Sequence, residues 1–247
     1  MRLHLQLLVV IHAEKEEERG LQRYITGVFM RMGIAVLITA LVSFLGFYSI
    51  VSEGFMYSLM TSETVGGIVF IVPAIIQMII CVVLNTKLMS LQTRTAELLL
   101  YAYATLTGFT FSVFGLLYET GTFFTAFAFA AVMFLCCAVI GHTTSVDLTK
   151  FGGIMIAGLI AMVIASIAAI FIPFLRDTLI ISYIGVILFL FLTAWDMQKI
   201  KGYYYGTQGG YGTVGQNLAV YGAFQLYLDF INLFLYILRI VGSRKRD

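Results

Sequence analysis

Long apolar stretches recur along this 247-residue chain, and they constrain its fold more than any other feature. Seven are visible, at residues 25–51, 65–84, 98–118, 123–140, 151–175, 179–197 and 218–241. A helix needs about 20 apolar residues to cross a bilayer. Backbone groups in lipid must be bonded within a helix or a closed barrel, and these stretches lack the alternation and length of barrel strands. The sequence therefore predicts an all-α polytopic membrane protein with seven transmembrane helices.

The composition leaves no room for an appreciable soluble domain. Hydrophobic residues make up 60% of the chain and charged residues 11%, against about 25% charged residues in soluble domains. We divide the chain into a cytosolic amino-terminal segment (1–24), a transmembrane domain (25–241) and a basic tail (242–247). The net charge of +2 gives no reason to expect nucleic acid as a partner. The lipid bilayer is the partner that this composition requires.

The basic residues in the loops, and in the amino-terminal region with the edge of the first apolar stretch, indicate the orientation in the membrane. Ten fall on one side: Arg2, Lys15, Arg19, Arg23, Arg31, Lys87, Arg94, Lys150, Lys199 and Lys201. The opposite loops hold only Arg176, so the positive-inside rule places the amino terminus in the cytosol. The basic tail would then lie outside against that rule, and we prefer a full last span to a segment that enters and returns. Without a retrieval signal or an N-x-[ST] sequon, we expect a bacterial inner membrane, with the endoplasmic reticulum as the alternative.

Two sequence patterns could suggest a nucleotide site or a metal site, but neither pattern is sufficient. Residues 210–215 contain a literal G-x-G-x-x-G, but a nucleotide site needs these glycines between a strand and a helix. We interpret the glycine-rich stretch as part of a long cytosolic loop at 198–217. The three histidines, His4, His12 and His142, have no second ligand at helical spacing. We therefore expect no metal site and no cofactor.

Small residues in the fifth apolar stretch predict a face for close helix packing. Gly153, Ala157 and Ala161 recur at four-residue spacing. In membranes, such spacing lets two helix backbones approach closely.

Two aspartates lie inside predicted spans, Asp196 in FLFLTAWDMQKI and Asp229 in FQLYLDFINLFLYILRI. A carboxylate in hydrocarbon costs a few kcal/mol, so both are functional candidates. If the sixth helix continues to Tyr204 and the seventh begins near Tyr221, both acids lie about 12 Å from the cytosolic ends. Antiparallel neighbours then bring the carboxyls together, and such a pair should hold one proton and titrate as a unit. The alternative is two separate acids, each protonated or neutralised by a lone basic partner.

These acids lie in the parts of the chain that resemble a known family. Residues 223–240, AFQLYLDFINLFLYILRI, are similar to the signature of the Bax inhibitor-1 family (transmembrane Bax inhibitor motif proteins), whose last span carries L-Y-L-D-F-I-N-L-F and a leucine-arginine ending. The aspartate and Q-x-I of the family's sixth span are matched at 195–200, WDMQKI, and the end of its fourth span by Gly141 and Asp147-Leu148. The resemblance covers residues 20–242, and we expect a bacterial member.

This resemblance implies a bundle of seven helices with the last helix central and wrapped by the other six. It also implies a pH-sensitive calcium leak and suppression of stress-induced cell death. Asp196 and Asp229 would be the proton sensor and line the ion pathway, with Asn232 as a polar neighbour. Gln77 and Lys87 occupy roughly the places of a second-span acid and of an arginine that latches the pair. A lysine lacks the bidentate fork of arginine, so its latch would be weaker or absent.

Three functions are weighed from the sequence. The leading one is a calcium leak pathway gated by Asp196 and Asp229. The alternative is a membrane regulator of stress or cell death that acts through other membrane proteins and transports nothing. An intramembrane aspartyl protease is the third, but Asp229 follows Leu226-Tyr227-Leu228 and not the G-x-G of those enzymes. We therefore expect no enzymatic activity.

Overall fold

Helices form the whole architecture, and no β-strand occurs among the residues that the structure describes. The computed structural model describes residues 2–62, 68–172, 174 and 178–242. The elements in chain order are α1 (Arg2–Val51), α2 (Phe55–Thr61), α3 (Ile71–Thr86), η1 (Leu88–Ser90), α4 (Thr93–Phe111), α5 (Phe114–Leu117), α6 (Thr120–Thr143), η2 (Leu148–Phe151), α7 (Gly152–Phe171), α9 (Ile180–Gly206) and α10 (Gly212–Val241).

Six helical stretches in the described part of the chain are long and apolar enough to cross a membrane: Glu14–Val51, Thr93–Leu117, Thr120–Thr143, Leu148–Ala169, Ile180–Gly206 and Gly212–Val241. The prediction of an all-helical polytopic membrane protein is confirmed at this level. Helix α3 has 16 residues, about 24 Å at about 1.5 Å per residue, which is short for a hydrocarbon core of about 30 Å. The predicted second span began at Val65, and residues 63–67 lie outside the described part, as do residues 243–247 of the basic tail. A seventh crossing therefore stays a prediction.

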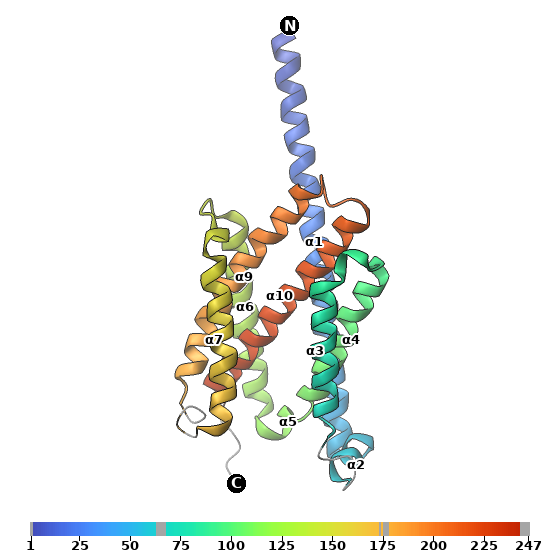
Figure 1. Cartoon of the computed structure of the whole chain (residues 1–247), viewed down its shortest axis with the longest axis vertical. Coiled ribbons are helices and arrows are strands. Elements are labelled where there is room, and N and C mark those ends of the chain that lie inside the picture. The colour runs from blue at the N-terminus through green and yellow to red at the C-terminus, as the bar shows by residue number, and fades with distance from the viewer. Residues whose placement is uncertain (1, 63–67, 173, 175–177, 243–247) are drawn as a thin grey trace.

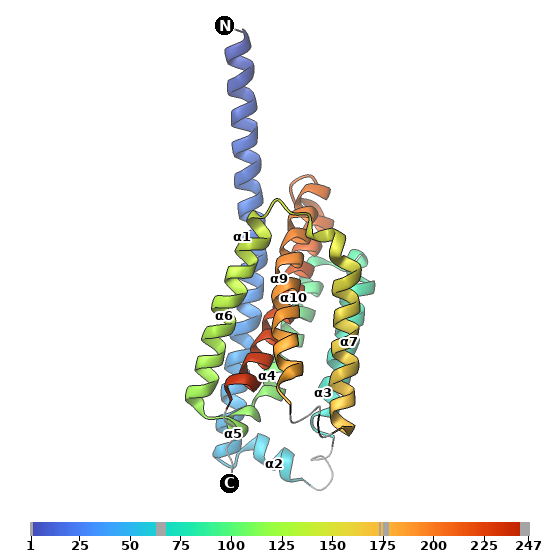
Figure 2. The same cartoon turned by 90° about the vertical axis from the view of Figure 1, so that its left-hand side faces the viewer.

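The long helices lie side by side in one bundle (Figures 1 and 2). Helix α10 packs against α9, α6, α1 and α4, while α3 packs on α4 and α7 on α9. In the most apolar part of α9 and of α10, 56% of the residues are buried, whereas in the most apolar part of α7 only 6% are buried. The last two helices are thus the most enclosed, and α7 lies at the edge. Encirclement of α10 by all six other helices stays a prediction.

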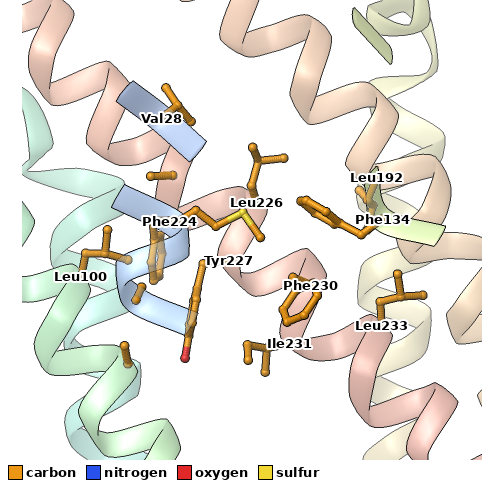
Figure 3. Close-up of a cluster of buried hydrophobic side chains, with 14 of the residues drawn as sticks. Val28, Leu100, Phe134, Leu192, Phe224, Leu226, Tyr227, Phe230, Ile231 and Leu233 are labelled. Carbon is orange, nitrogen blue, oxygen red and sulfur yellow. The ribbon is translucent and has the colours of Figure 1, made fainter. Parts of the chain in front are cut away.

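The core of the bundle is a layer of large apolar side chains contributed by helices far apart in the sequence (Figure 3). Helix α10 supplies Leu226, Phe230 and Leu233, which are buried against side chains of α1, α4, α6 and α9. The rings of Phe134 and Phe230 meet edge to face, with centroids 5.6 Å apart. Because α10 carries apolar residues around its whole circumference, it can be covered on several sides at once.

The connection between α9 and α10 is a short turn and not the long loop that the sequence predicted. Helix α9 continues to Gly206, and α10 begins at Gly212 instead of near Tyr221, so the predicted loop and helix start are wrong. The stretch looked like a loop because glycines lower helix propensity. Here tertiary packing holds it in helices and a five-residue turn, 207–211.

Packing of this turn on α1 explains its glycines. Gly210 has φ +72° and lies against the ring of Tyr24, where a Cβ would overlap the ring. A Cβ on Gly215 would overlap the backbone of Gly210. The Tyr24 hydroxyl donates a hydrogen bond to the Gly215 carbonyl over 3.2 Å. The G-x-G-x-x-G pattern thus has a structural cause in close packing.

Helix α1 extends well beyond the bundle at its amino-terminal end (Figures 1 and 2). The predicted cytosolic segment at 1–24 is helical from Arg2 and continuous with the first span. Where α1 leaves the bundle, the Tyr204 hydroxyl of α9 donates to the Glu17 carbonyl over 3.1 Å. The projecting part therefore begins close to the α9–α10 turn.

The predicted packing face on the fifth span is wrong. Gly153, Ala157 and Ala161 are exposed on α7. The side that contacts α9 carries Gly158, where a Cβ would lie 2.9 Å from Leu188. Four-residue spacing alone did not reveal which face of so apolar a helix turns inward, since both faces carry small residues.

Candidate functional site

The two aspartates meet in the most enclosed part of the bundle, between α9 and α10. The exposed fraction is 4% for Asp196 and 5% for Asp229, and their carboxyl groups lie within hydrogen-bonding reach of each other. Asp196 is ten residues before the end of α9 and Asp229 is 17 after the start of α10, so equal depth from the turn is not what brings them together. Helices α9 and α10 both cross the bundle obliquely and pack against each other along their lengths (Figure 1).

Lys199 supplies the positive charge beside this pair. Its Nζ lies 2.8 Å from Asp196 Oδ1, one turn further along α9. The same ammonium lies 4.1 Å from the ring centroid of Trp195, a distance at which a cation is attracted to the face of an indole. The sequence reasoning overlooked this lysine as a partner, although residues three apart on a helix are neighbours and the spacing alone could have indicated it.

The remaining hydrogen bonds are distributed unevenly over the two acids. Gln225 Nε2 donates to Asp196 Oδ1 over 3.4 Å, and Tyr203 donates to Gln225 Oε1 over 3.3 Å. Asp229 Oδ2 is buried and has no hydrogen-bond partner among the described residues. A buried carboxylate without a donor is costly, whereas one proton between the two carboxyls removes their mutual repulsion. The arrangement is therefore suited to holding a single proton.

Among the described residues, no hydrogen bond or ion pair joins the other predicted site residues to the two aspartates. Gln77 Nε2 donates to Thr107 Oγ1 over 2.8 Å, and Asn232 Nδ2 donates to its own helix at the Leu228 carbonyl over 2.8 Å. Lys87 is exposed after the end of α3 and makes no ion pair with either aspartate. In the part of the chain that the structure describes, no three His, Cys, Asp or Glu side chains form a group that could hold a metal ion.

A second polar cluster, which the sequence did not indicate, joins three helices away from the acids. The fully buried Tyr227 hydroxyl shares a 2.7 Å hydrogen bond with Thr39 Oγ1 of α1. Thr39 also donates to the Ala104 carbonyl of α4 over 3.0 Å, and Thr107, the partner of Gln77, lies within hydrogen-bonding reach of Tyr227. These polar groups satisfy one another's hydrogen-bonding capacity, and the hydrogen bonds link the helices that carry them.

Polar contacts also fasten the end of the bundle that holds the α9–α10 turn. Arg31 Nε of α1 lies 2.7 Å from Glu97 Oε1 of α4, and Arg31 Nη2 donates to Gln216 of α10 over 3.1 Å. In the α6–α7 loop, the Thr149 hydroxyl donates to Asp147, which holds the pKa of that carboxyl below its ordinary value. Asp147 is thus an ionised, exposed aspartate outside the bundle.

The fold and the site define a class, the polytopic helical membrane proteins with a buried acid pair on their last two helices. A family model described as inhibitor of apoptosis-promoting Bax1 matches residues 21–246. The chain belongs to the Bax inhibitor-1 family, which confirms the resemblance seen in the sequence.

Similar proteins are found in several bacteria. An uncharacterized protein of Rickettsia prowazekii is 36% identical over 98% of each chain. The inner membrane protein YbhL of Escherichia coli is 34% identical over 92% of this chain and 94% of YbhL. An uncharacterized membrane protein of Streptococcus pyogenes is 34% identical over 92% of this chain and 95% of its own. Each of these matches covers at least 92% of this chain.

Proposed function

We propose that the protein is a pH-sensitive cation leak pathway in which Asp196 and Asp229 form the gate. The observation that carries the proposal is the contact of two buried carboxyl groups, with one lysine as their counter-charge, between the two most enclosed helices. Ionisable groups at membrane depth mark ion or proton pathways by default. Calcium is the proposed permeant ion because oxygen atoms are its preferred ligands and because the family resemblance implies it.

The gate follows from the charges in the site. With one shared proton, the pair and Lys199 sum to zero charge, and α9 and α10 stay packed together. Loss of the proton leaves two carboxylates against one ammonium; like charges about 4 Å apart repel by about 4 kcal/mol at an effective dielectric constant near 20. The helices then separate and expose carboxylate oxygens to water and cations. In this account, Lys199 performs from within α9 the latch role expected of Lys87.

Calcium flux from loaded proteoliposomes, measured between about pH 6 and about pH 8, tests this function. The wild-type flux should rise with pH, and an Asp196→Asn, Asp229→Asn double variant should show low flux that no longer depends on pH. Asp147→Asn is the matched control, because this aspartate is exposed and ionised outside the bundle. An unchanged pH dependence in the double variant would refute the gate. Flux no higher than in empty liposomes would favour the non-transporting regulator.

The proposal includes a topology. Helix α3 belongs to the seventh crossing, α10 is central, and the amino terminus is cytosolic. The distribution of basic residues supports this orientation. The name of the similar Escherichia coli protein, an inner membrane protein, supports a bacterial inner membrane as the location.

A further inference from the structure

A groove runs between α1 and α6 at the end of the bundle that holds the α9–α10 turn. Both helices lie next to α9 and α10, and Met197 of α9 closes the bottom of the groove. Its volume is about 350 Å³, within the range of about 300–1,000 Å³ that small-molecule sites occupy. Neither the acid pair nor the gate described above uses this groove.

The walls of the groove change from apolar to polar along its length. The deeper part is lined by Phe29 of α1 and by Leu135 and Val139 of α6. The outer part is lined by Gln22 and Thr26 of α1, and by His142 in the last turn of α6. Such a gradient, on helices that are long enough to span a membrane, matches a molecule with an apolar chain and a polar head.

Basic side chains gather at the polar end. Arg23 is exposed beside Gln22 and Thr26, in an adjoining hollow on α1, and no ion pair or hydrogen bond of its side chain occurs among the described residues. Lys201 Nζ donates to the His142 carbonyl over 2.7 Å, which leaves two of its three donors for another acceptor. Arg19 contributes less, because it pairs with Glu16 at 2.9 Å.

His142 lines the polar end of the groove, and its side chain is half-buried. Its Nδ1 atom is enclosed within the protein and has no hydrogen bond among the residues that the structure describes. The glutamates of α1 at 14 and 16–18 precede Arg19 in the sequence, and Glu16 forms an ion pair with Arg19, so Arg23 and Lys201 are the basic groups that we consider at this end of the groove.

We infer that this groove binds one anionic phospholipid, with an acyl chain between α1 and α6 and the phosphate at Arg23 and Lys201. A lipid fits better than a soluble anion, because the deeper walls are apolar. Leu135 and Val139 are also exposed on the side of the bundle that would face the acyl chains of the bilayer. Basic pockets between membrane helices on the cytosolic side are suited to acidic lipid head groups. Binding would hold α1 against α6 and α9.

Native mass spectrometry of the whole protein, titrated with phosphatidylglycerol or phosphatidylethanolamine in detergent, tests this site. The wild type should bind one phosphatidylglycerol in preference to phosphatidylethanolamine. An Arg23→Gln, Lys201→Gln double variant should lose about 25-fold of that preference, since each basic residue near an acidic lipid contributes about fivefold. Arg94→Gln, a change of an exposed arginine at the start of α4, should keep it. An equal loss in Arg94→Gln, or no preference in the wild type, would overturn the proposal.

A second pair of variants tests the acyl chain. Val139→Trp fills the groove and should weaken binding of both lipids, while Val132→Trp on the same helix should not. The two valines are equally exposed, at 60% and 61%, and only Val139 lines the groove. Thermal unfolding checks that all four variants are folded. If glycerol phosphate displaces phosphatidylglycerol, or if Val139→Trp binds lipid as the wild type does, the site recognises an anion alone and the lipid assignment is wrong.

Discussion

At the scale of single residues, the site holds two carboxyl groups and one ammonium group in the low-dielectric interior of the bundle. Asp196 has a lysine and a glutamine as partners, while Asp229 has the carboxyl group of Asp196 beside it. Burying charges is favourable only when they are paired and hydrogen-bonded. One proton completes the set, and this is why we assign function to the pair and not to either acid alone.

Lys199→Gln should destabilise the protein by about 1–3 kcal/mol, because Asp196 loses its counter-charge while staying buried. Thermal unfolding in detergent measures this loss, which should shrink at low pH, where a protonated Asp196 needs no counter-charge. Lys150→Gln is the control: Lys150 also follows an aspartate by three residues, but its side chain is 77% exposed and 3.8 Å from Asp147. That change should stay within about 0.5 kcal/mol of wild type. Equal effects of the two changes would contradict the role of Lys199.

The sequence predicted the acids but not their surroundings. Asp196 and Asp229 were found because charge is rare in apolar spans. Lys87 was expected as the latch from the family pattern, whereas the lysine beside the pair is Lys199, a local neighbour on α9. Which side chains converge on Asp229 depends on the tilt and rotation of α10, and no local pattern encodes these.

At the scale of elements, close approach of helix backbones positions the site. Gly141 of α6 lies against the backbone of Ala194, two residues before Asp196. In membranes, small residues at such crossings give helices their tightest contacts. Helix α9 is thus fixed between α6 on one side and α10 on the other, which holds the carboxyl groups in contact.

Gly141→Ala should destabilise the bundle by about 1–3 kcal/mol, because its Cβ would lie 2.7 Å from the Ala194 Cα, with no flexible side chain to move aside. Gly202→Ala, on α9 itself, has nothing within 4 Å of the added carbon and should stabilise by about 0.4–1 kcal/mol. Thermal unfolding of both variants in one detergent makes the comparison. The packing account fails if Gly141→Ala unfolds at the wild-type temperature.

Element positions were predicted well where apolar runs are long, and poorly where packing overrides local preference. The fourth predicted stretch, 123–140, falls inside α6. The start of α10 was placed too late, because its first turns are rich in glycine and polar residues. Asn217, in these turns, is fully buried and donates to the carbonyls of Leu88 and Leu91, each over 2.9 Å. Such a tertiary link leaves no trace in a single sequence.

At the scale of the whole molecule, the number of crossings decides where the two ends lie. With seven crossings the termini are on opposite sides of the membrane, and in the structure the start of α1 and the end of α10 lie at opposite ends of the molecule (Figure 1). Helix α2 and the α9–α10 turn likewise lie at opposite ends. This arrangement makes the proposed topology testable without any assumption about transport.

Single cysteines in a background without Cys81, Cys136 and Cys137 test the topology in intact cells. We expect Tyr57→Cys in α2 to react with a membrane-impermeant maleimide from outside. Gln208→Cys in the α9–α10 turn should react only after the cells are opened. Both native side chains are exposed, so failure to label reports location and not burial. Labelling in the reverse pattern would overturn the proposed orientation.

The central claim is that Asp196 and Asp229 share one proton and titrate as a unit. Infrared difference spectra of the carboxyl C=O stretch, recorded in bilayers across the pH range of the flux assay, test it most directly. The account predicts one protonated carboxyl that titrates in the wild type. The C=O signal of this protonated carboxyl group should be absent in Asp229→Asn, because Lys199 neutralises the ionised Asp196. In Asp196→Asn the signal should be present but should not change with pH, because Asp229 stays protonated. A wild-type titration that survives unchanged in either single variant would show two independent acids and contradict the account.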